Sequence, residues 1–217
     1  MRKFAIIFTV FTMVLSGCGK INPYIAHVSE LRQEIYQGTA EEINITATYG
    51  FCESPYINDG KTGNVIYGLT FVMHAFPDEV RRVLNFRKGD REYSAAFILD
   101  EITSEYKATV EIKADMGKEF SATLNTGDST VPVLFKSIVP AKCISYDDAL
   151  QVLEEKQSAL LNSYIKDGVF QAEIYMRVFV KDGTPYWYIG IAAGNDRLKA
   201  LLIDGVSGNL LAVRDII

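Results

Sequence analysis

Residues 42–49 read EINITATY, and this stretch decides the class of fold. Ile43, Ile45 and Ala47 alternate with polar neighbours, and this period of two is typical of a strand with one buried face. Further β-rich segments of the same kind follow, at residues 64–76, 80–86, 92–99, 104–112, 118–124 and 131–138. The pattern predicts about seven strands in this part of the chain.

Turn-prone clusters separate these segments: NDGKTGN (58–64), RKGD (87–90), DMGK (115–118) and NTGDST (125–130). Short strands with turns between them are typical of an antiparallel sandwich, with a closed antiparallel sheet as the alternative. We therefore expect a β-sandwich domain over residues 41–140, immunoglobulin-like by its strand count. An antibody-type Cys-Trp-Cys signature is lacking, because the one tryptophan, Trp187, lies far downstream.

A helix is predicted after this domain, from IVPAKCISYDDAL (138–150). Pro140 ends the strand pattern, and Ser145 with Asp148 three residues later is a start signal in which the serine oxygen accepts from a free N–H group. Apolar residues at helical spacing follow, and Gly168 is a natural C-terminal cap. The sequence therefore predicts one long helix over residues 146–166.

The last 49 residues favour four antiparallel strands. These are VFQAEIYMRVFVK (169–181), TPYWYIGIAAG (184–194), LKALLID (198–204) and NLLAVRD (209–215), with turns at Asp182-Gly183 and DGVSG (204–208). Residues 141–217 are thus expected to form a small α+β domain, a long helix on an antiparallel sheet. The expected fold class is mainly β with an α+β part.

The chain begins with features of an exported protein. Arg2 and Lys3 precede an apolar run, Phe4 to Leu15, that is too short to span a bilayer and suits the core of a signal peptide. The run ends in Leu15-Ser16-Gly17-Cys18, which resembles the lipobox of bacterial lipoprotein precursors. That resemblance implies cleavage of residues 1–17 and a lipid on Cys18, which would attach the protein to a membrane surface outside the cytoplasm.

Residues 18–40 are expected to carry this anchor, a tether and a short amphipathic helix. The helix is predicted within residues 21–37, where Ile25, Val28, Leu31 and Ile35 have helical spacing. Loss of residues 1–17 would remove two of the 22 basic side chains, leaving 20 against 27 acidic ones, a net charge of −7. An acidic chain without basic clusters is not expected to bind nucleic acid.

Few residues suit catalysis or metal binding. The two histidines, His27 and His74, are too few for a zinc site, and no phosphate-binding loop is present, so neither a metal nor a cofactor is expected. Cys52 and Cys143 are a candidate disulfide pair outside the cytoplasm, with two independent reduced thiols as the alternative. A secreted hydrolase remains the alternative function. It would use Cys52 with His74, or a carboxylate pair drawn from acids such as Glu53, Asp59, Glu101 and Asp204.

Aromatic residues offer a binding hypothesis. Tyr186, Trp187 and Tyr188 are consecutive, so a strand sends Trp187 to one face and both tyrosines to the other. Either face would be a candidate binding surface if it met solvent, because Tyr and Trp are favoured at protein contacts. The alternative is that Trp187 fills the core beneath the helix.

The order of helix, strands, PYWYIGI (185–191) and LLIDGVSGNLLAVRD (201–215) resembles the PepSY-type modules of bacterial envelope proteins. This resemblance covers about 70 residues and implies an extracytoplasmic module, without catalytic activity, that binds or restrains other proteins. In that motif a small polar Thr before the second Gly is common. This sequence instead has Gly205-Val206-Ser207 there. We therefore expect a non-enzymatic, lipid-anchored envelope protein that binds a protein or peptide partner.

Overall fold

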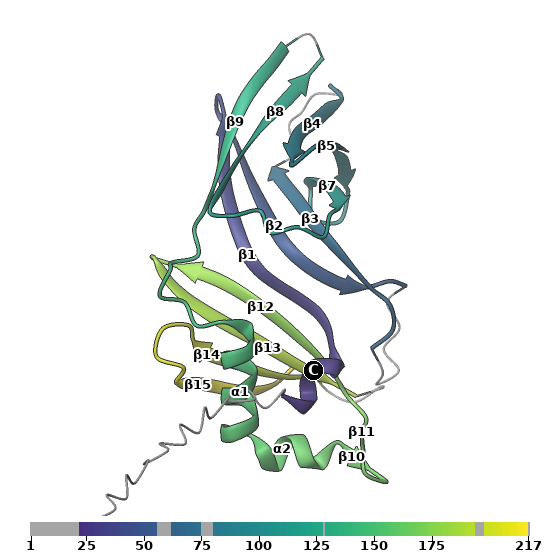
Figure 1. Cartoon of the computed structure of the whole chain (residues 1–217), viewed down its shortest axis with the longest axis vertical. Coiled ribbons are helices and arrows are strands. Elements are labelled where there is room, and N and C mark those ends of the chain that lie inside the picture. Colours follow the sequence, from purple (N-terminus) through teal and green to yellow (C-terminus); the bar gives the residue numbers. More distant parts are fainter. Residues whose placement is uncertain (1–21, 56–61, 75–79, 128, 194–197, 217) are drawn as a thin grey trace, which may run out of the picture.

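A computed structural model shows a chain that is mainly β-structure, with one large, mostly antiparallel sheet and two α-helices in the described part (Figure 1). The structure describes residues 22–55, 62–74, 80–127, 129–193 and 198–216. The predicted signal peptide, Cys18 and Asp59 lie outside these residues. None of the helices within them has the length and apolar character needed to cross a membrane.

The first half of the chain consists of strands. They are β1 (Val28–Ala40), β2 (Ile43–Glu53), β3 (Val65–His74), β4 (Arg82–Lys88), β5 (Arg91–Ala96), β6 (Ile98–Asp100), β7 (Glu105–Glu111), β8 (Glu119–Thr126) and β9 (Ser129–Ser137). Residues 43–49, where the period-two alternation predicts a strand, lie in β2. In Figure 1 these strands, apart from the beginning of β1, form the upper lobe.

The second half forms the lower lobe, together with the short 3-10 helix η1 (Pro23–His27) and the beginning of β1. Its elements are α1 (Tyr146–Lys156), α2 (Ser158–Ser163), β10 (Ile165–Lys166), β11 (Val169–Phe170), β12 (Glu173–Lys181), β13 (Thr184–Ala192), β14 (Leu198–Asp204) and β15 (Leu210–Ile216). The last four strands correspond to the four that the sequence predicts, except that residues 169–172 do not belong to β12: Val169 and Phe170 form β11 instead.

Strand β1 joins the two lobes. It pairs with β2 from Glu30 to Ala40. On its other edge it pairs in parallel with β12 at residues 28–32 and antiparallel with β9 at Tyr36 and Gln37. The sheet therefore runs β15-β14-β13-β12-β1-β2-β3-β7-β6, and β9, β8, β4 and β5 branch from the far part of β1.

The short helix predicted within residues 21–37 is wrong beyond His27. Residues from Val28 onward are β1, and the register shifts near Ser29 and again between Arg32 and Glu34. Each shift inserts one residue into β1. The core-facing side chains therefore change from even to odd positions at the first shift and back to even positions at the second. Buried Val28, Leu31 and Tyr36 consequently have spacings of three and five, so residues 25–35 have a helix-like pattern although they form mostly a bulged strand.

The upper lobe is not confirmed as an immunoglobulin-like sandwich. Thirteen strands hydrogen-bond into a single sheet, and the upper part of that sheet curls around its own core instead of forming two separate sheets. Aromatic rings fill this core. The Phe120 ring stacks on that of Phe135 with 4.8 Å between ring centroids, and the centroids of the Phe71 and Phe135 rings are 5.5 Å apart. Burying such large rings contributes much of the packing energy of a domain.

The predicted long helix is broken in the structure. Its start is confirmed, because Ser145 and Asp148 form a reciprocal capping box. Gln157 then leaves the helical conformation, with φ −131° and ψ 29°, and separates α1 from α2. The break turns the chain along the bottom of the lobe, where Leu161 is buried in the lower core with Leu153 (Figure 1). Gly168, the predicted cap, instead has a φ of +77° in the turn between β10 and β11.

Two cores correspond to the two lobes. The buried residues of the upper core lie between Tyr36 and Phe135. The lower core combines Val28 and Leu31 with residues from Val139 onward. Residues 28–40, expected to belong to a tether, are therefore central to the sheet and contribute to both cores.

Candidate functional site

The side chain of Trp187 is part of the lower core. It is 2% exposed, lies on β13 among the buried residues beneath α1, and donates a hydrogen bond from Nε1 to the carbonyl oxygen of Ile144 at 3.1 Å. The indole ring is thus buried and does not offer a broad surface to a partner. The structure favours the alternative in which Trp187 fills the core.

The two neighbouring tyrosines lie on the opposite face of the sheet. Tyr186 is paired with Phe179 of β12, and their rings stack at 5.3 Å with an interplanar angle of 22°. Tyr188 is paired with Arg177, and both tyrosines are half-buried while Phe179 is 37% exposed. We call Phe179, Tyr186 and Tyr188 the outer aromatic face. The helix α1 covers the other side of these strands (Figure 1).

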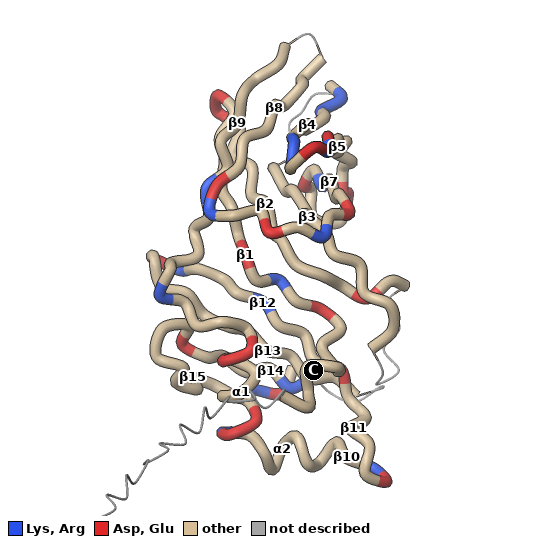
Figure 2. Tube along the Cα trace, in the orientation of Figure 1, with Lys and Arg blue, Asp and Glu red and all other residues tan. Residues whose placement is uncertain are grey.

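Charged residues border the outer aromatic face. Arg177 donates to Glu30 at 2.8 Å, and Arg32 pairs with the same carboxylate. Across the described residues, acidic and basic side chains are interspersed in both lobes (Figure 2). A partner docking on the aromatic rings would therefore meet hydrogen-bonding groups at the rim, as is usual at protein interfaces.

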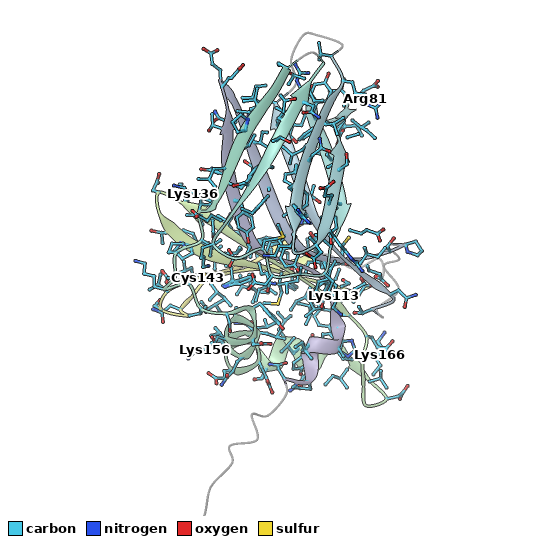
Figure 3. The ribbon with its side chains drawn as sticks, turned by 45° about the horizontal axis from the view of Figure 1, so that its top comes forward. Arg81, Lys113, Lys136, Cys143, Lys156 and Lys166 are labelled. Atoms are coloured by element: carbon cyan, nitrogen blue, oxygen red, sulfur yellow. The ribbon has the colours of Figure 1, made fainter. Side chains whose placement is uncertain are left out.

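A pocket of about 490 Å³ lies where the two lobes meet. Segments far apart in the sequence line this junction pocket: β1, β2, the loop before β8, the loop between β9 and α1, and β13. Its apolar wall includes Val139, Pro140 and Trp187, and its polar residues include Glu34 and Asp115. Cys143 also lines it, at the level where the lobes join (Figure 3).

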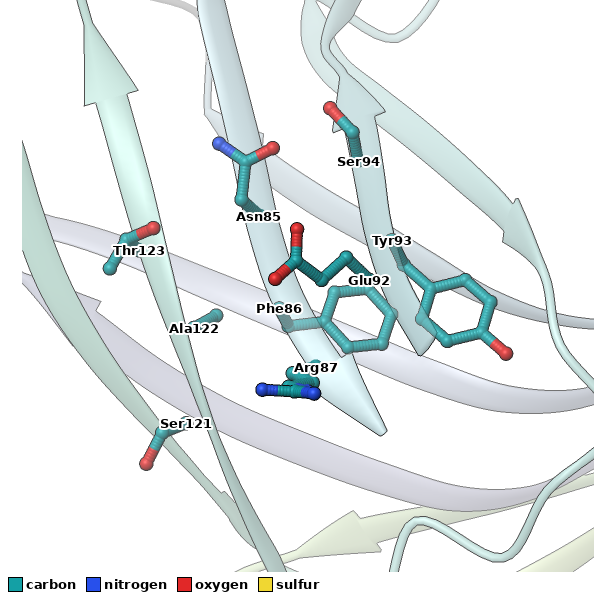
Figure 4. Close-up of a pocket in the computed structure, with 9 residues that line it drawn as sticks. All are labelled: Asn85, Phe86, Arg87, Glu92, Tyr93, Ser94, Ser121, Ala122 and Thr123. Carbon is teal, nitrogen blue, oxygen red and sulfur yellow. The ribbon is translucent and has the colours of Figure 1, made fainter. Parts of the chain in front are cut away.

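A second hollow, of about 470 Å³, lies on the upper lobe (Figure 4). Strand pairing aligns Ser94, Asn85 and Thr123 in one row across β5, β4 and β8. Glu92 lies opposite Arg87 in the next row, but the two do not form an ion pair of 4 Å or less in the described structure. Phe86, Tyr93 and Ala122 also line this open hollow, so its lining is partly polar and partly apolar.

Cys52 and Cys143 are both free, so the disulfide considered from the sequence is not formed. Cys52 is exposed on β2, and Cys143 is partly buried in the junction pocket. Burial, together with the charge of Glu34, raises the pKa of the Cys143 thiol above its ordinary value. A raised pKa leaves less thiolate at neutral pH, which makes this thiol a poor nucleophile.

The structure does not bring Cys52 and His74 together. Cys52 is paired with Ile66 of β3, whereas His74 is eight residues further along the same strand. At roughly 3.3 Å per residue, this separates them by about 26 Å along the strand. A cysteine and histidine must be within hydrogen-bond reach to act as nucleophile and base.

The proposed acids are also dispersed. Glu53 is buried at the end of β2, Glu101 is exposed in the turn before β7, at the other end of β3, and Asp204 ends β14 in the lower lobe. Asp204 accepts hydrogen bonds from the backbone N–H groups of Ser207 and Val206, and these lower its pKa. It acts as a turn former between β14 and β15.

No group of three or more His, Cys, Asp or Glu side chains suited to a metal ion occurs among the residues described. No protein-family model matches the chain, and neither a curated protein nor a solved structure matches it. The outer aromatic face was predictable from strand alternation at residues 186–188. The junction pocket was not, because its residues come from five segments without a common sequence pattern.

Proposed function

We propose that this protein is a cell-envelope lipoprotein, held to a bacterial membrane by a lipid on Cys18, that binds a protein or peptide partner without catalysing a reaction. The proposal for the anchor rests on the sequence: a basic start, an apolar run and the Leu15-Ser16-Gly17-Cys18 motif. The resemblance of residues 141–217 to PepSY-type modules supports a binding role.

The observation that carries the binding role is the outer aromatic face. Phe179 and Tyr186 stack on the side of the sheet away from α1, and Tyr188 lies on the same face. The hydroxyl groups of Tyr186 and Tyr188 make no hydrogen bond within the described residues. Rings with apolar bodies and free hydroxyls are the kind of anchor that protein interfaces favour.

Site-specific cross-linking on intact cells tests this proposal. A photoreactive phenylalanine derivative placed at position 188 should yield a discrete adduct with one envelope protein. The matched control places it at Leu134, which is 46% exposed on β9 of the upper lobe and should yield none. Phe179→Ser together with Tyr186→Ser should abolish the adduct at position 188. Adducts of equal yield from both positions, or none from position 188, would contradict the proposal.

The anchor has its own test. Mass spectrometry of the protein from cells should find an acylated cysteine at position 18 as the new N-terminus. Cys18→Ser should leave the protein unacylated and no longer retained with the membrane fraction. An unmodified Cys18 behind an intact leader would contradict the lipoprotein assignment without affecting the cross-linking result.

A further inference from the structure

The junction pocket is large enough to take a long side chain. Its volume is about 490 Å³, and it lies between two packed lobes, a place where ligand sites often occur. Val139, Pro140 and Trp187 are among the apolar residues that line it. Glu34 and Asp115 supply carboxylates, and Tyr49 a phenol ring.

The carboxylates of Glu34 and Asp115 have hydrogen-bond partners, but their capacity to accept hydrogen bonds is not fully used. Glu34 accepts from Ser137 at 2.8 Å and pairs with the Lys118 ammonium at 3.2 Å, and Lys118 is 66% exposed. An exposed pair of this kind contributes little and exchanges readily for another cation. Asp115 accepts from the Gly117 N–H at 2.7 Å through one oxygen, and its other oxygen makes no hydrogen bond or ion pair within the described residues.

The surrounding titratable groups experience a negative potential. After burial, the charges of Glu34 and Asp115 raise the pKa of Tyr36. Burial, Tyr67 and then the charge of Asp115 raise the pKa of Tyr49. Burial and then the charge of Glu34 raise the pKa of Cys143, which the charge of Lys118 lowers to a smaller extent. Two carboxylates against one exposed ammonium therefore make the pocket favourable for an added positive charge.

We propose that the junction pocket binds a lysine or arginine side chain of a partner protein, with its charged head at Asp115 and Glu34 and its aliphatic stem along Val139 and Pro140. Lysine and arginine combine an apolar stem with a cationic head, which matches the two kinds of surface in the pocket. This inference rests on the proposed function only in that the partner supplies the side chain.

Tryptophan fluorescence can report binding in the junction pocket. Trp187 is the only tryptophan of the sequence, and it lines the pocket. We expect acetyl-Gly-Lys-Gly-amide, titrated into the full chain, to change the tryptophan fluorescence in a saturable way that weakens at high salt. The same peptide with norleucine, which keeps the stem without the charge, should bind about tenfold more weakly.

Charge-neutralising variants locate the binding. Asp115→Asn keeps the acceptor for Gly117 and should weaken the lysine peptide about tenfold. The matched control is Asp90→Asn, an exposed aspartate in the turn between β4 and β5, which should leave the affinity unchanged. Equal binding of the lysine and norleucine peptides, or equal affinity of Asp115→Asn and the original chain, would overturn the inference.

The two free thiols provide a second readout that needs no pocket variant. In the full chain carrying Cys18→Ser, the lysine peptide should slow alkylation of Cys143 and leave that of Cys52 unchanged, as resolved by peptide mass spectrometry. Equal rates at Cys143 with and without the peptide would also overturn the inference. Loss of cross-linking at position 188 with the peptide response intact would instead contradict only the proposed function.

Discussion

Trp187 donates its indole N–H to the backbone carbonyl of Ile144, a residue 43 positions earlier, at 3.1 Å. The Ile144 N–H in turn donates to the carbonyl of Gly205, and the Gly205 N–H donates to that of Pro185. These bonds tie the loop before α1 to β13 and to the turn after β14. One wall of the junction pocket therefore depends on the orientation of a single buried ring.

Trp187→Phe should destabilise the protein. The phenylalanine ring keeps most of the apolar contact but leaves the Ile144 carbonyl without its donor, which costs about 1–3 kcal/mol for a buried group. Urea unfolding followed by far-ultraviolet circular dichroism measures the change. Tyr188→Phe removes a hydroxyl without a partner in the described structure and should change stability by no more than about 0.5 kcal/mol. Equal stability of the two variants would contradict this account.

Ser145→Ala should weaken the start of α1. The Ser145 hydroxyl accepts from the Asp148 N–H at 3.1 Å, and loss of such a cap costs about 0.5–2 kcal/mol. Ser158→Ala is the matched control, because Ser158 is exposed at the first residue of α2 and makes no capping bond. Thermal unfolding should show a lower midpoint for Ser145→Ala alone, and a matching decrease for Ser158→Ala would argue against the capping role.

Gly50→Ala should be severely destabilising. A Cβ atom at this position would lie 1.7 Å from the carbonyl oxygen of Leu31, where β1 bulges against β2, and backbone atoms cannot move aside cheaply. We expect a loss of about 3 kcal/mol or more, or failure to fold. Thr46→Ala on the same strand should remain soluble and folded. A Gly50→Ala protein with an unchanged urea midpoint would falsify the close approach.

The carboxyl of Asp100 should titrate at unusually low pH. Its hydrogen bonds from Lys107 Nζ, at 2.7 Å, and from the backbone N–H groups of Thr103 and Ile102 lower its pKa from 3.8 to about 2. Because the folded pKa lies below the unfolded one, the associated stability is present above about pH 3.8 and is lost as the pH falls through about 2. Carbon-detected NMR titration measures the pKa directly.

Lys107→Met provides the comparison for that titration. It removes the main cause of the shift, so the Asp100 pKa should rise towards 3.8, while the turn of residues 101–104 keeps its backbone bonds. The acid-induced loss of stability should then begin at a higher pH than in the original chain. An Asp100 pKa that stays at about 2 in Lys107→Met would show that the ammonium is not its main cause.

Local patterns in the sequence determined much of the secondary structure. The period-two alternation of Ile43, Ile45 and Ala47 predicted β2, and the capping box of Ser145 and Asp148 predicted the start of α1, because strand faces and helix ends depend on near neighbours. Alternation also predicted that Trp187 and its flanking tyrosines face opposite ways. The structure then decided which of the two faces is buried.

Three features depended on tertiary structure alone. Residues 28–40 form the central strand because they bond to β2, β9 and β12 at once. Two bulges allow these pairings, and because of them the buried residues of this strand do not follow a period of two. The expected helix broke at Gln157 in a chain that packs both Leu153 and Leu161 into one core. The junction pocket brought Glu34, Asp115 and Trp187 together. Sequence periodicity reports burial along one element, whereas strand pairing and a shared core are set by contacts between residues far apart in the chain, and only the folded structure specifies those.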